Sequence, residues 1–259
     1  MHNDDHPIGR LLSRRELVAL FGASAEAALA RGAVAQVLPS GQQRTASDCV
    51  AQPAQTEGPY FVDEHLQRSD IRVDPATGAR TDGAPLALRF ALSRVLPDGT
   101  CAVLEGAQFD IWHCDARGVY SDVRDRSFDT TGQKFLRGYE VSDANGLVAF
   151  TTIYPGWYSG RAVHVHFKIR VTAEGGRADE FTSQLYFSDA LTDRVHATAP
   201  YSTKKGQRLL NERDMIFREG GTKLVLPVDE QDGVLAATYR IAMRPGQPRQ
   251  NRGRRGVRL

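Results

Sequence analysis

Short apolar segments separated by turn residues run through the chain from residue 85 to residue 243. Leu86–Leu96 (LALRFALSRVL) has the pattern of a half-buried strand, and Pro97-Asp98-Gly99 follows it as a turn. Similar segments begin at residues 107, 136, 147, 163, 181, 223 and 234. Strands at this spacing, without long helices between them, predict an all-β protein: a β-sandwich of mostly antiparallel strands with little helix.

Two turns and one helix complete the expected arrangement. Asn145-Gly146 predicts a tight hairpin, because both positions tolerate a positive φ. Pro155-Gly156 predicts a turn that carries Tyr158 back towards the strand after it. Lys204–Glu219 is the one segment that we expect to form a surface helix, and residues 223–228 and 234–243 are expected to close the sheet.

The most informative segment is GWYSGRAVHVHFKI, residues 156–169. Side chains two residues apart on a strand point to the same face, so His164 and His166 share one face and the apolar residues around them share the other. Two adjacent imidazoles form half of a metal site. The phenols of Tyr120 and Tyr158 are candidates for the other half, and two imidazoles with two phenolates would suit ferric iron.

Other interpretations stay open when only the residues are considered. A His-x-His sequence on a strand is also typical of a polar cross-strand pair on a wet face. Zinc or copper would accept the same two nitrogens. Three further phenols compete as ligands, namely Tyr139, Tyr154 and Tyr186. Tyr154 is disfavoured because it precedes the Pro-Gly turn.

Four motifs, taken in order, resemble those of the intradiol ring-cleavage dioxygenases. They are TEGPYF (56–61), FDIWHCDARGVYSD (109–122), IYPGWYSGRAVHVHF (153–167) and SQLYF (183–187). The resemblance covers about residues 48–218. Four motifs in the same order are far more specific than His-x-His alone.

The resemblance implies an enzyme with a defined set of metal ligands. It makes four residues the ligands of a non-haem Fe(III): Tyr120, Tyr158, His164 and His166. The implied reaction uses O2 to cleave a catechol-type aromatic between its two hydroxyl-bearing carbons, giving a muconate-type product. Tyr158 is implied to be the ligand that departs when substrate binds. Only five residues separate Tyr158 from His164, fewer than in the well-known catechol and protocatechuate enzymes, and this short loop resembles the exported members of the family.

The resemblance also implies two catalytic residues beside the substrate. Arg161 matches the active-site arginine of the family, and Gln184 matches a glutamine near the substrate. Arg161 would stabilise charge that develops on the ring, since a fixed cation acts most strongly where water is excluded. From the residues alone, Arg161 also fits a surface salt bridge and Gln184 an outward strand position. Trp112 and Trp157 flank the phenols as aromatic walls, although Trp112 fits an ordinary core position better.

Two other functions stay open. An exported β-sandwich could keep the scaffold as a binding module without catalysis, because a fold does not fix a function. That hypothesis predicts the loss of one or more ligands, and all four are present. A zinc hydrolase built on His-x-His would need a third His, Asp or Glu ligand, and no HExxH or similar signature occurs.

Composition and charge set the boundaries of the domain. The 259 residues are 41% hydrophobic and 25% charged, as in ordinary soluble domains, and no apolar run approaches the ~20 residues of a membrane helix. We expect one β-sandwich domain over residues 46–243, a signal-like or disordered segment over 1–45 and a disordered Arg-rich tail over 244–259. The tail holds six Arg and no acid, so the net charge of +2 hides an acidic remainder. The expected partners are the catechol-type substrate and O2, without nucleic acid, and a homodimer is the oligomer considered.

The amino-terminal segment predicts export. Arg14 and Arg15 precede a modestly apolar segment, as in a twin-arginine signal, and Ala33-Val34-Ala35 supplies a cleavage site. A periplasmic or extracellular protein that begins near Gln36 would follow. The alternative is a cytoplasmic protein with a short amphipathic helix or frayed tail, which Glu26 favours because it interrupts the apolar segment.

Three cysteines bear on the same question: Cys49, Cys101 and Cys114. In an exported protein we expect one disulfide and one buried thiol. A bridge between Cys49 and Cys114 would join the amino-terminal arm to the site, although the sequence does not fix the pairing. Three buried thiols are the alternative.

Overall fold

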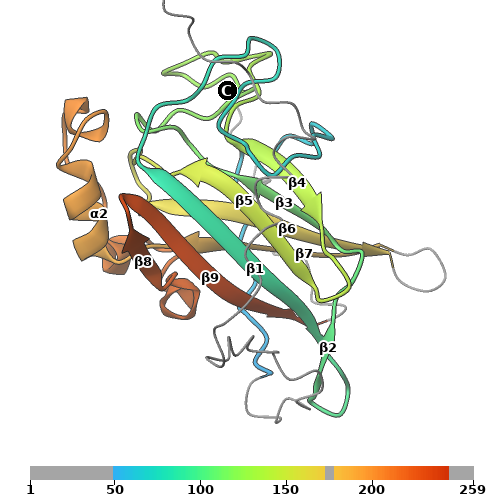
Figure 1. Cartoon of the computed structure of the whole chain (residues 1–259). Coiled ribbons are helices and arrows are strands. Elements are labelled where there is room, and N and C mark those ends of the chain that lie inside the picture. The colour runs from blue at the N-terminus through green and yellow to red at the C-terminus, as the bar shows by residue number, and fades with distance from the viewer. Residues whose placement is uncertain (1–48, 173–177, 245–259) are drawn as a thin grey trace, which may run out of the picture. The chain divides into compact units, whose positions relative to one another are not determined.

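The structure is a computed structural model that describes residues 49–172 and 178–244 of the chain. The predicted export signal and nearly all of the Arg-rich tail lie outside these residues. The described strands form two sheets (Figure 1). No helix among the described residues has the length and apolar character needed to cross a membrane.

The first sheet is organised around β1 (Pro85–Val95). One edge of β1 pairs antiparallel with β5 (Leu147–Ile153) and β2 (Cys101–Val103). Its other edge pairs with β9 (Val234–Met243), and these two strands run parallel. The antiparallel β8 (Val228–Gln231) then covers the far edge of β9. The centre of this sheet is therefore a pair of strands, β1 and β9, that lie far apart in the chain.

The second sheet has the order β4-β3-β6-β7, and all its pairs are antiparallel. The four strands are β3 (Gln108–Trp112), β4 (Arg137–Val141), β6 (His164–Thr172) and β7 (Ala178–Tyr186). The predicted all-β sandwich of mostly antiparallel strands is therefore confirmed. The segment from residue 181 forms most of β7 and pairs with the histidine strand β6.

Aromatic side chains from both sheets meet in the core. The ring of Phe90, from β1, stacks on that of Phe109, from β3, with 4.7 Å between ring centroids. Phe109 stacks in turn on Phe167 of β6 at 5.3 Å. All three are fully buried, and each such side chain contributes about 1.5–3 kcal/mol through burial. Since β6 is fixed through this layer, the opposite face of β6 is held in place.

The turn at Asn145-Gly146 forms, but the hairpin prediction is wrong. Gly146 has a φ of 73°, and its amide donates to the Asp143 carbonyl oxygen at 2.8 Å. The strands on either side are β4 and β5, which belong to different sheets. The turn therefore passes the chain from one sheet to the other. The local signal specified the turn, whereas the pairing partners were decided by tertiary contacts.

The predicted surface helix over residues 204–219 is also wrong. This segment holds only turns and the short 3-10 helix η3 (Asn211–Arg213). The side chain of Asp214 accepts hydrogen bonds from the amides of Ile216 and Phe217, and such local bonds compete with a helix. The α-helix lies earlier, at α2 (Asp189–His196), where the Ser188 side chain accepts from an amide of the first turn.

Residues 223–228 were predicted to close the sheet, and this prediction is wrong for most of them. The 3-10 helix η4 (Gly221–Leu224) takes up the start of the segment, and Val225 makes only an isolated bridge to Tyr186. The strand β8 begins at the last of these residues. Another 3-10 helix, η2 (Tyr201–Thr203), follows α2.

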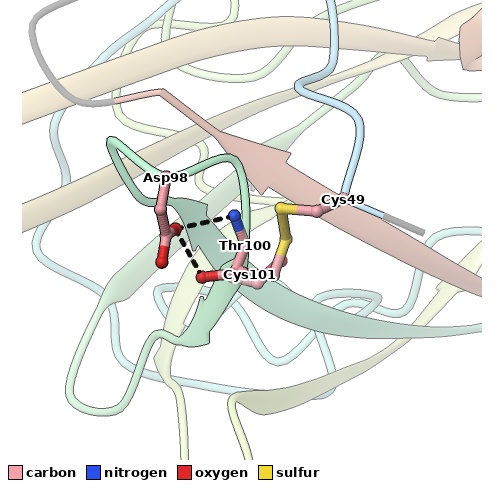
Figure 2. Close-up of a disulfide and its surroundings, with 5 residues drawn as sticks. Cys49, Asp98, Thr100 and Cys101 are labelled. Carbon is pink, nitrogen blue, oxygen red and sulfur yellow. Dashed lines mark hydrogen bonds between the residues drawn. A yellow bond between two sulfur atoms is a disulfide. The ribbon is translucent and has the colours of Figure 1, made fainter. Parts of the chain in front are cut away.

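The disulfide joins Cys49 to Cys101, with their Cα atoms 5.4 Å apart, so the Cys49–Cys114 pairing is corrected (Figure 2). Cys101 begins β2, directly after a turn in which the Asp98 carboxylate accepts from the Thr100 amide and hydroxyl. Cys114 is a buried free thiol in the loop that follows β3 of the other sheet. The expected count of one disulfide and one buried thiol is confirmed.

The amino-terminal arm, residues 49–61, runs from the first sheet to the second. The Gln52 amide donates to the Ala242 carbonyl oxygen of β9 at 2.8 Å. Three residues later the Gln55 amide donates to the Thr182 carbonyl oxygen of β7 at 3.0 Å. The arm therefore covers an edge of each sheet before it reaches the histidine face of β6.

Candidate metal centre

The two histidines of β6 lie side by side on the face opposite the core. Val165 and Phe167 join the apolar core, whereas His164 and His166 point the other way, as the strand alternation predicted. The imidazole centroids are 4.6 Å apart and the two Nε2 atoms are 2.9 Å apart. Both side chains are buried, so the interpretation as a wet polar pair is not supported.

Two phenols complete the cluster. The Tyr158 hydroxyl lies 3.2 Å from His164 Nε2, and the Tyr120 hydroxyl lies 3.5 Å from the same atom. The structure therefore brings together all four residues that the sequence proposed as ligands. Of the rival phenols, Tyr154 bonds Thr192, and Tyr186 bonds two glutamine side chains outside the cluster.

The loops that carry the two phenols are tied to each other. The Gly156 amide donates to the Asp115 carbonyl oxygen at 3.0 Å. The Lys204 ammonium donates to the carbonyl oxygens of Arg117 and Trp157, which precede Tyr120 and Tyr158 in the two loops. Gly118 has a φ of 82°, and a Cβ there would lie 2.1 Å from the Trp157 carbonyl oxygen. This close approach explains why the loop needs glycine and fixes the distance between the phenols.

The histidine tautomer suits a metal ligand. His164 Nδ1 lies 2.6 Å from the Ala162 carbonyl oxygen, and since a carbonyl only accepts, Nδ1 carries the proton. The lone pair of Nε2 then faces the cluster, in the arrangement that metal-binding histidines adopt. His166 has no such bond. Its Nδ1 is buried and has no hydrogen-bond partner among the described residues. Its ring is held instead by stacking on Trp112, at 5.0 Å and 5° between planes.

Burial controls the charge of the four groups. Burial, reinforced by the Arg161 charge, lowers the pKa values of His164 and His166 well below their usual range, so both rings are neutral donors. Burial also raises the pKa values of Tyr120 and Tyr158, while the Arg161 charge acts in the opposite sense. A phenolate in this site therefore needs a nearby cation. The donor set of two imidazoles and two phenols, with atoms converging within 3.5 Å of His164 Nε2, fits ferric iron.

A site made only of the usual zinc ligands is not present in the described part of the chain. No group of three or more His, Cys, Asp or Glu side chains gathers there in a way that could hold a metal. The zinc hydrolase hypothesis required such a third ligand. Among the described residues, the phenols of Tyr120 and Tyr158 are therefore the candidates to complete a metal site at the two histidines.

Aromatic rings from the amino-terminal arm form one wall of the site. Tyr60 stacks on Tyr120 with 4.5 Å between centroids, and its hydroxyl donates to Asp125 at 3.0 Å. Gly58 approaches His166 closely enough that a Cβ would lie 3.4 Å from the ring. The first motif, which contains both Gly58 and Tyr60, therefore lies beside the site. Trp112 is fully buried beneath His166, as a core residue that also supports a ligand.

A cavity of about 510 Å³ opens beside Tyr158. Its lining includes Tyr60, Phe128, Trp157, Tyr158, Arg117 and Lys204. Tyr158 is half-buried at this cavity, whereas Tyr120 is 1% exposed and does not line it. A larger surface cavity of about 890 Å³ also touches Trp157, but none of the four candidate ligands lines it. Access to the cluster from the cavities is therefore on the Tyr158 side.

Arg161 and Gln184 lie together next to the cluster. Gln184 faces His166 across the β6–β7 pair and is fully buried, which rules out an outward position. Its side-chain oxygen accepts a bond from Arg161 Nη2, and its nitrogen donates to the Thr56 carbonyl oxygen at 2.8 Å. The Arg161 side chain is only 15% exposed. Its partner is the buried Asp214, which could not be identified from the sequence because it falls in the wrongly predicted helix.

The similarity to known proteins extends over most of the domain. A family profile described as "Dioxygenase" matches residues 56–225. A solved intradiol ring-cleavage dioxygenase from Tetranychus urticae superposes with a TM-score of 0.66 at 30% identity, over 78% of this chain and 98% of that one.

Curated relatives match a smaller share. A chlorocatechol 1,2-dioxygenase from Pseudomonas sp. strain P51 is 30% identical over 150 residues, and the match covers 51% of this chain and 53% of that protein. One from Pseudomonas putida is 26% identical over 164 residues, covering 56% of this chain and 55% of that protein. The chain thus spans about half the length of these two relatives.

Proposed function

The chain belongs to the intradiol ring-cleavage dioxygenases, and from this membership we propose that it is a non-haem Fe(III) enzyme that cleaves a catechol-type aromatic with O2. The observation that carries the proposal is the convergence of Tyr120, Tyr158, His164 and His166 within 3.5 Å of one nitrogen atom. In the proposal these four side chains hold the iron. When bound, ferric iron supplies a Lewis-acidic, redox-active centre that withdraws electron density from a coordinated catechol.

Tyr158 is proposed to make room for the substrate and to take one of its protons. It is the phenol that lines the cavity, so it can move without opening the core. A phenolate oxygen at Tyr158 is a base strong enough to accept a proton from a catechol hydroxyl, and such proton transfer typically contributes 10²–10⁴-fold. Tyr120 is buried under Tyr60 and stays in place.

Arg161 is proposed to stabilise negative charge on the substrate ring. Its charge acts to lower the pKa values of all four candidate ligands, which supports a position close to the proposed reacting centre. A preorganised cation in a site sheltered from water stabilises developing charge more strongly than one in solvent. Gln184 orients the guanidinium through its side-chain oxygen.

The test combines colour with oxygen uptake. Iron-loaded protein should be red-brown from phenolate-to-Fe(III) charge transfer, whereas zinc-loaded protein should be colourless. Oxygen consumption should be measured with catechol, protocatechuate, hydroxyquinol and substituted catechols, and one O2 should be used for each ring cleaved. Iron-loaded protein that binds catechols without consuming O2 would favour the binding-module alternative. A colourless iron-loaded protein without uptake would contradict the proposal.

A further inference from the structure

Asp214 is a buried carboxylate that has no role in the reaction proposed above. Its side chain is 1% exposed. Oδ2 accepts from Arg161 Nε at 2.9 Å and from the Ala162 amide at 2.8 Å. Oδ1 accepts from the amides of Ile216 and Phe217 at 2.7 and 3.2 Å. One carboxylate therefore joins the segment just before the histidine pair to a loop far along the chain.

The bonds around Asp214 close into a ring. From the Asp214 loop, the Ile216 carbonyl oxygen accepts from the Gln55 side chain at 2.9 Å. The Tyr186 hydroxyl lies 3.0 Å from Gln55 Oε1 and 3.1 Å from Gln184 Oε1, so its single proton is shared between them. Gln184 Oε1 also accepts from Arg161, which returns the path to Asp214. This closed network of hydrogen bonds connects the amino-terminal arm, β7 and two loops, so the Arg161 guanidinium has little conformational freedom.

Two nitrogens of Arg161 are occupied by this ring and one is not. Nε binds Asp214 and Nη2 binds Gln184. None of the hydrogen bonds in this ring uses Nη1. A planar guanidinium fixed at two nitrogens has its third nitrogen fixed as well, because the fork is rigid. Asp214 also offsets the Arg161 charge, which would otherwise be costly at this depth.

We propose that Asp214 is a positioning residue for catalysis, which holds Arg161 so that Nη1 is presented to the substrate. This inference rests on the proposed function, because it needs the ring-cleavage reaction as its readout. A positioning role for Asp214 differs from a purely structural role in one respect. A positioning residue acts only through Arg161, whereas a purely structural carboxylate supports the fold whatever residue stands at position 161.

A double-mutant cycle distinguishes the two roles. Asp214→Asn should lower kcat by about 10- to 100-fold, the range for loss of a group that orients another, with KM changed much less. In an Arg161→Met background, Asp214→Asn should cause no further loss of kcat, because its target is gone. Iron content and the visible band should stay near wild type in all three variants, and thermal unfolding should confirm that each is folded. Asp214→Ser, which keeps one oxygen for the backbone amides, serves as the second variant.

A matched control uses another carboxylate–arginine pair in the same part of the chain. Asp189→Asn removes an ion pair with Arg208, a largely buried arginine, and should change kcat less than twofold. Equal losses of kcat from Asp214→Asn in the wild-type and Arg161→Met backgrounds would overturn the inference while leaving the proposed function intact. Absence of ring cleavage by the iron-loaded wild-type protein would overturn both.

Discussion

At the scale of single residues, the two phenols of the cluster differ in how much room each has to leave it when a substrate binds. Tyr120 is enclosed between Tyr60 and the core, and Tyr158 borders the cavity. Both hydroxyls reach His164 Nε2, so both can serve as ligands, but only one has room to leave. The chemistry of the site therefore depends on exposure as much as on the type of side chain.

Replacing Tyr158 with Phe tests this assignment. The fold and some iron should remain, while kcat falls by about 10²–10⁴-fold and the visible band shifts, because one phenolate and one base are lost. Tyr154→Phe is the matched control, since that hydroxyl bonds Thr192 outside the cluster and should leave the band unchanged. An unchanged spectrum together with unchanged turnover would remove Tyr158 from the set of ligands.

The histidine pair gives a second prediction. His164→Ala or His166→Ala should produce a folded, colourless and iron-poor protein. Its activity should fall by more than the roughly 100-fold that is typical when a residue that only orients a metal ligand is replaced. Folding should survive because the apolar face of β6 is untouched. Arg161→Ala should instead keep iron and colour while it loses turnover. Iron analysis and absorption spectra make the measurement, and coloured, active histidine variants would contradict the metal site.

The six residues proposed for the site could be identified from the sequence, but for two different reasons. Strand alternation alone placed His164 and His166 on one face, whereas the phenols, Arg161 and Gln184 depended on the resemblance between motifs. Asp214 had no such signal. Its partners, Arg161 and Ala162, are distant in the sequence, and its own segment has the pattern of a surface helix.

At the scale of elements, the two sheets are linked by a histidine outside the candidate metal centre. His113 follows β3, and its Nε2 lies 2.7 Å from the Thr152 hydroxyl of β5 in the other sheet. Its Nδ1 lies 2.8 Å from the Cys114 carbonyl oxygen, so Nδ1 carries the proton and Nε2 accepts from the hydroxyl. The ring is fully buried, and burial lowers its pKa to about 4.

This histidine should make the sandwich less stable in acid. Between pH 6.5 and pH 4 the unfolded chain binds a proton at His113 that the folded protein does not, so stability falls as pH falls through this range. The free energy of unfolding of the wild type should drop relative to His113→Gln by on the order of 3 kcal/mol between pH 7 and pH 4. Urea unfolding of iron-free protein at several pH values measures this.

The comparison with a variant is needed because other groups titrate in the same range. Burial raises the pKa of Asp110 to about 6, which favours the folded state as pH falls and opposes the His113 effect. His65→Gln is the matched control, since the side chain of His65 is 80% exposed. Parallel pH profiles for wild type and His113→Gln would show that His113 does not contribute.

Elements were predictable where one local pattern decided the structure. The long strands β1, β6 and β9 follow from apolar runs and alternation, because the core-facing side of each strand is buried along most of its length. The partners of each strand could not be read from the chain, as the turn at Asn145-Gly146 shows. The helix α2 had a serine cap and an acidic first turn, but its eight residues are too short for a clear periodic pattern.

At the scale of the whole molecule, the disulfide secures the start of the domain. Cys49 and Cys101 close a loop with a sequence separation of 52 residues. Cys49→Ser with Cys101→Ser should lower the free energy of unfolding by about 2–4 kcal/mol, measured by urea unfolding, without change in iron content. A reducing agent should destabilise the wild type and leave the double variant unaffected. Equal stability with and without the bridge would contradict this.

The disulfide also supports export, since such bonds persist in oxidising compartments. We propose that Arg14 and Arg15, which lie outside the described residues, form a twin-arginine signal. Lysine at both positions should leave the protein in the cytoplasm, whereas the wild type should be recovered outside it with an amino terminus near Gln36. Fractionation and amino-terminal sequencing test this, with uncleaved wild-type chain in the cytoplasm as the contrary result.

The parallel pairing of β1 with β9 has a consequence for the order in which the chain can fold. Leu86–Arg94 pairs with residues at the far end of the domain, Leu235–Met243. During synthesis at about 5–20 residues per second, β1 waits on the order of ten seconds for this partner. One edge of the central strand stays open to other chains over that time. The strands that carry the histidines and their neighbours, β3, β4, β6 and β7, have by then all been made. The ribosome therefore delivers the sheet that carries the histidine pair before it delivers the last strand of the sheet packed against it.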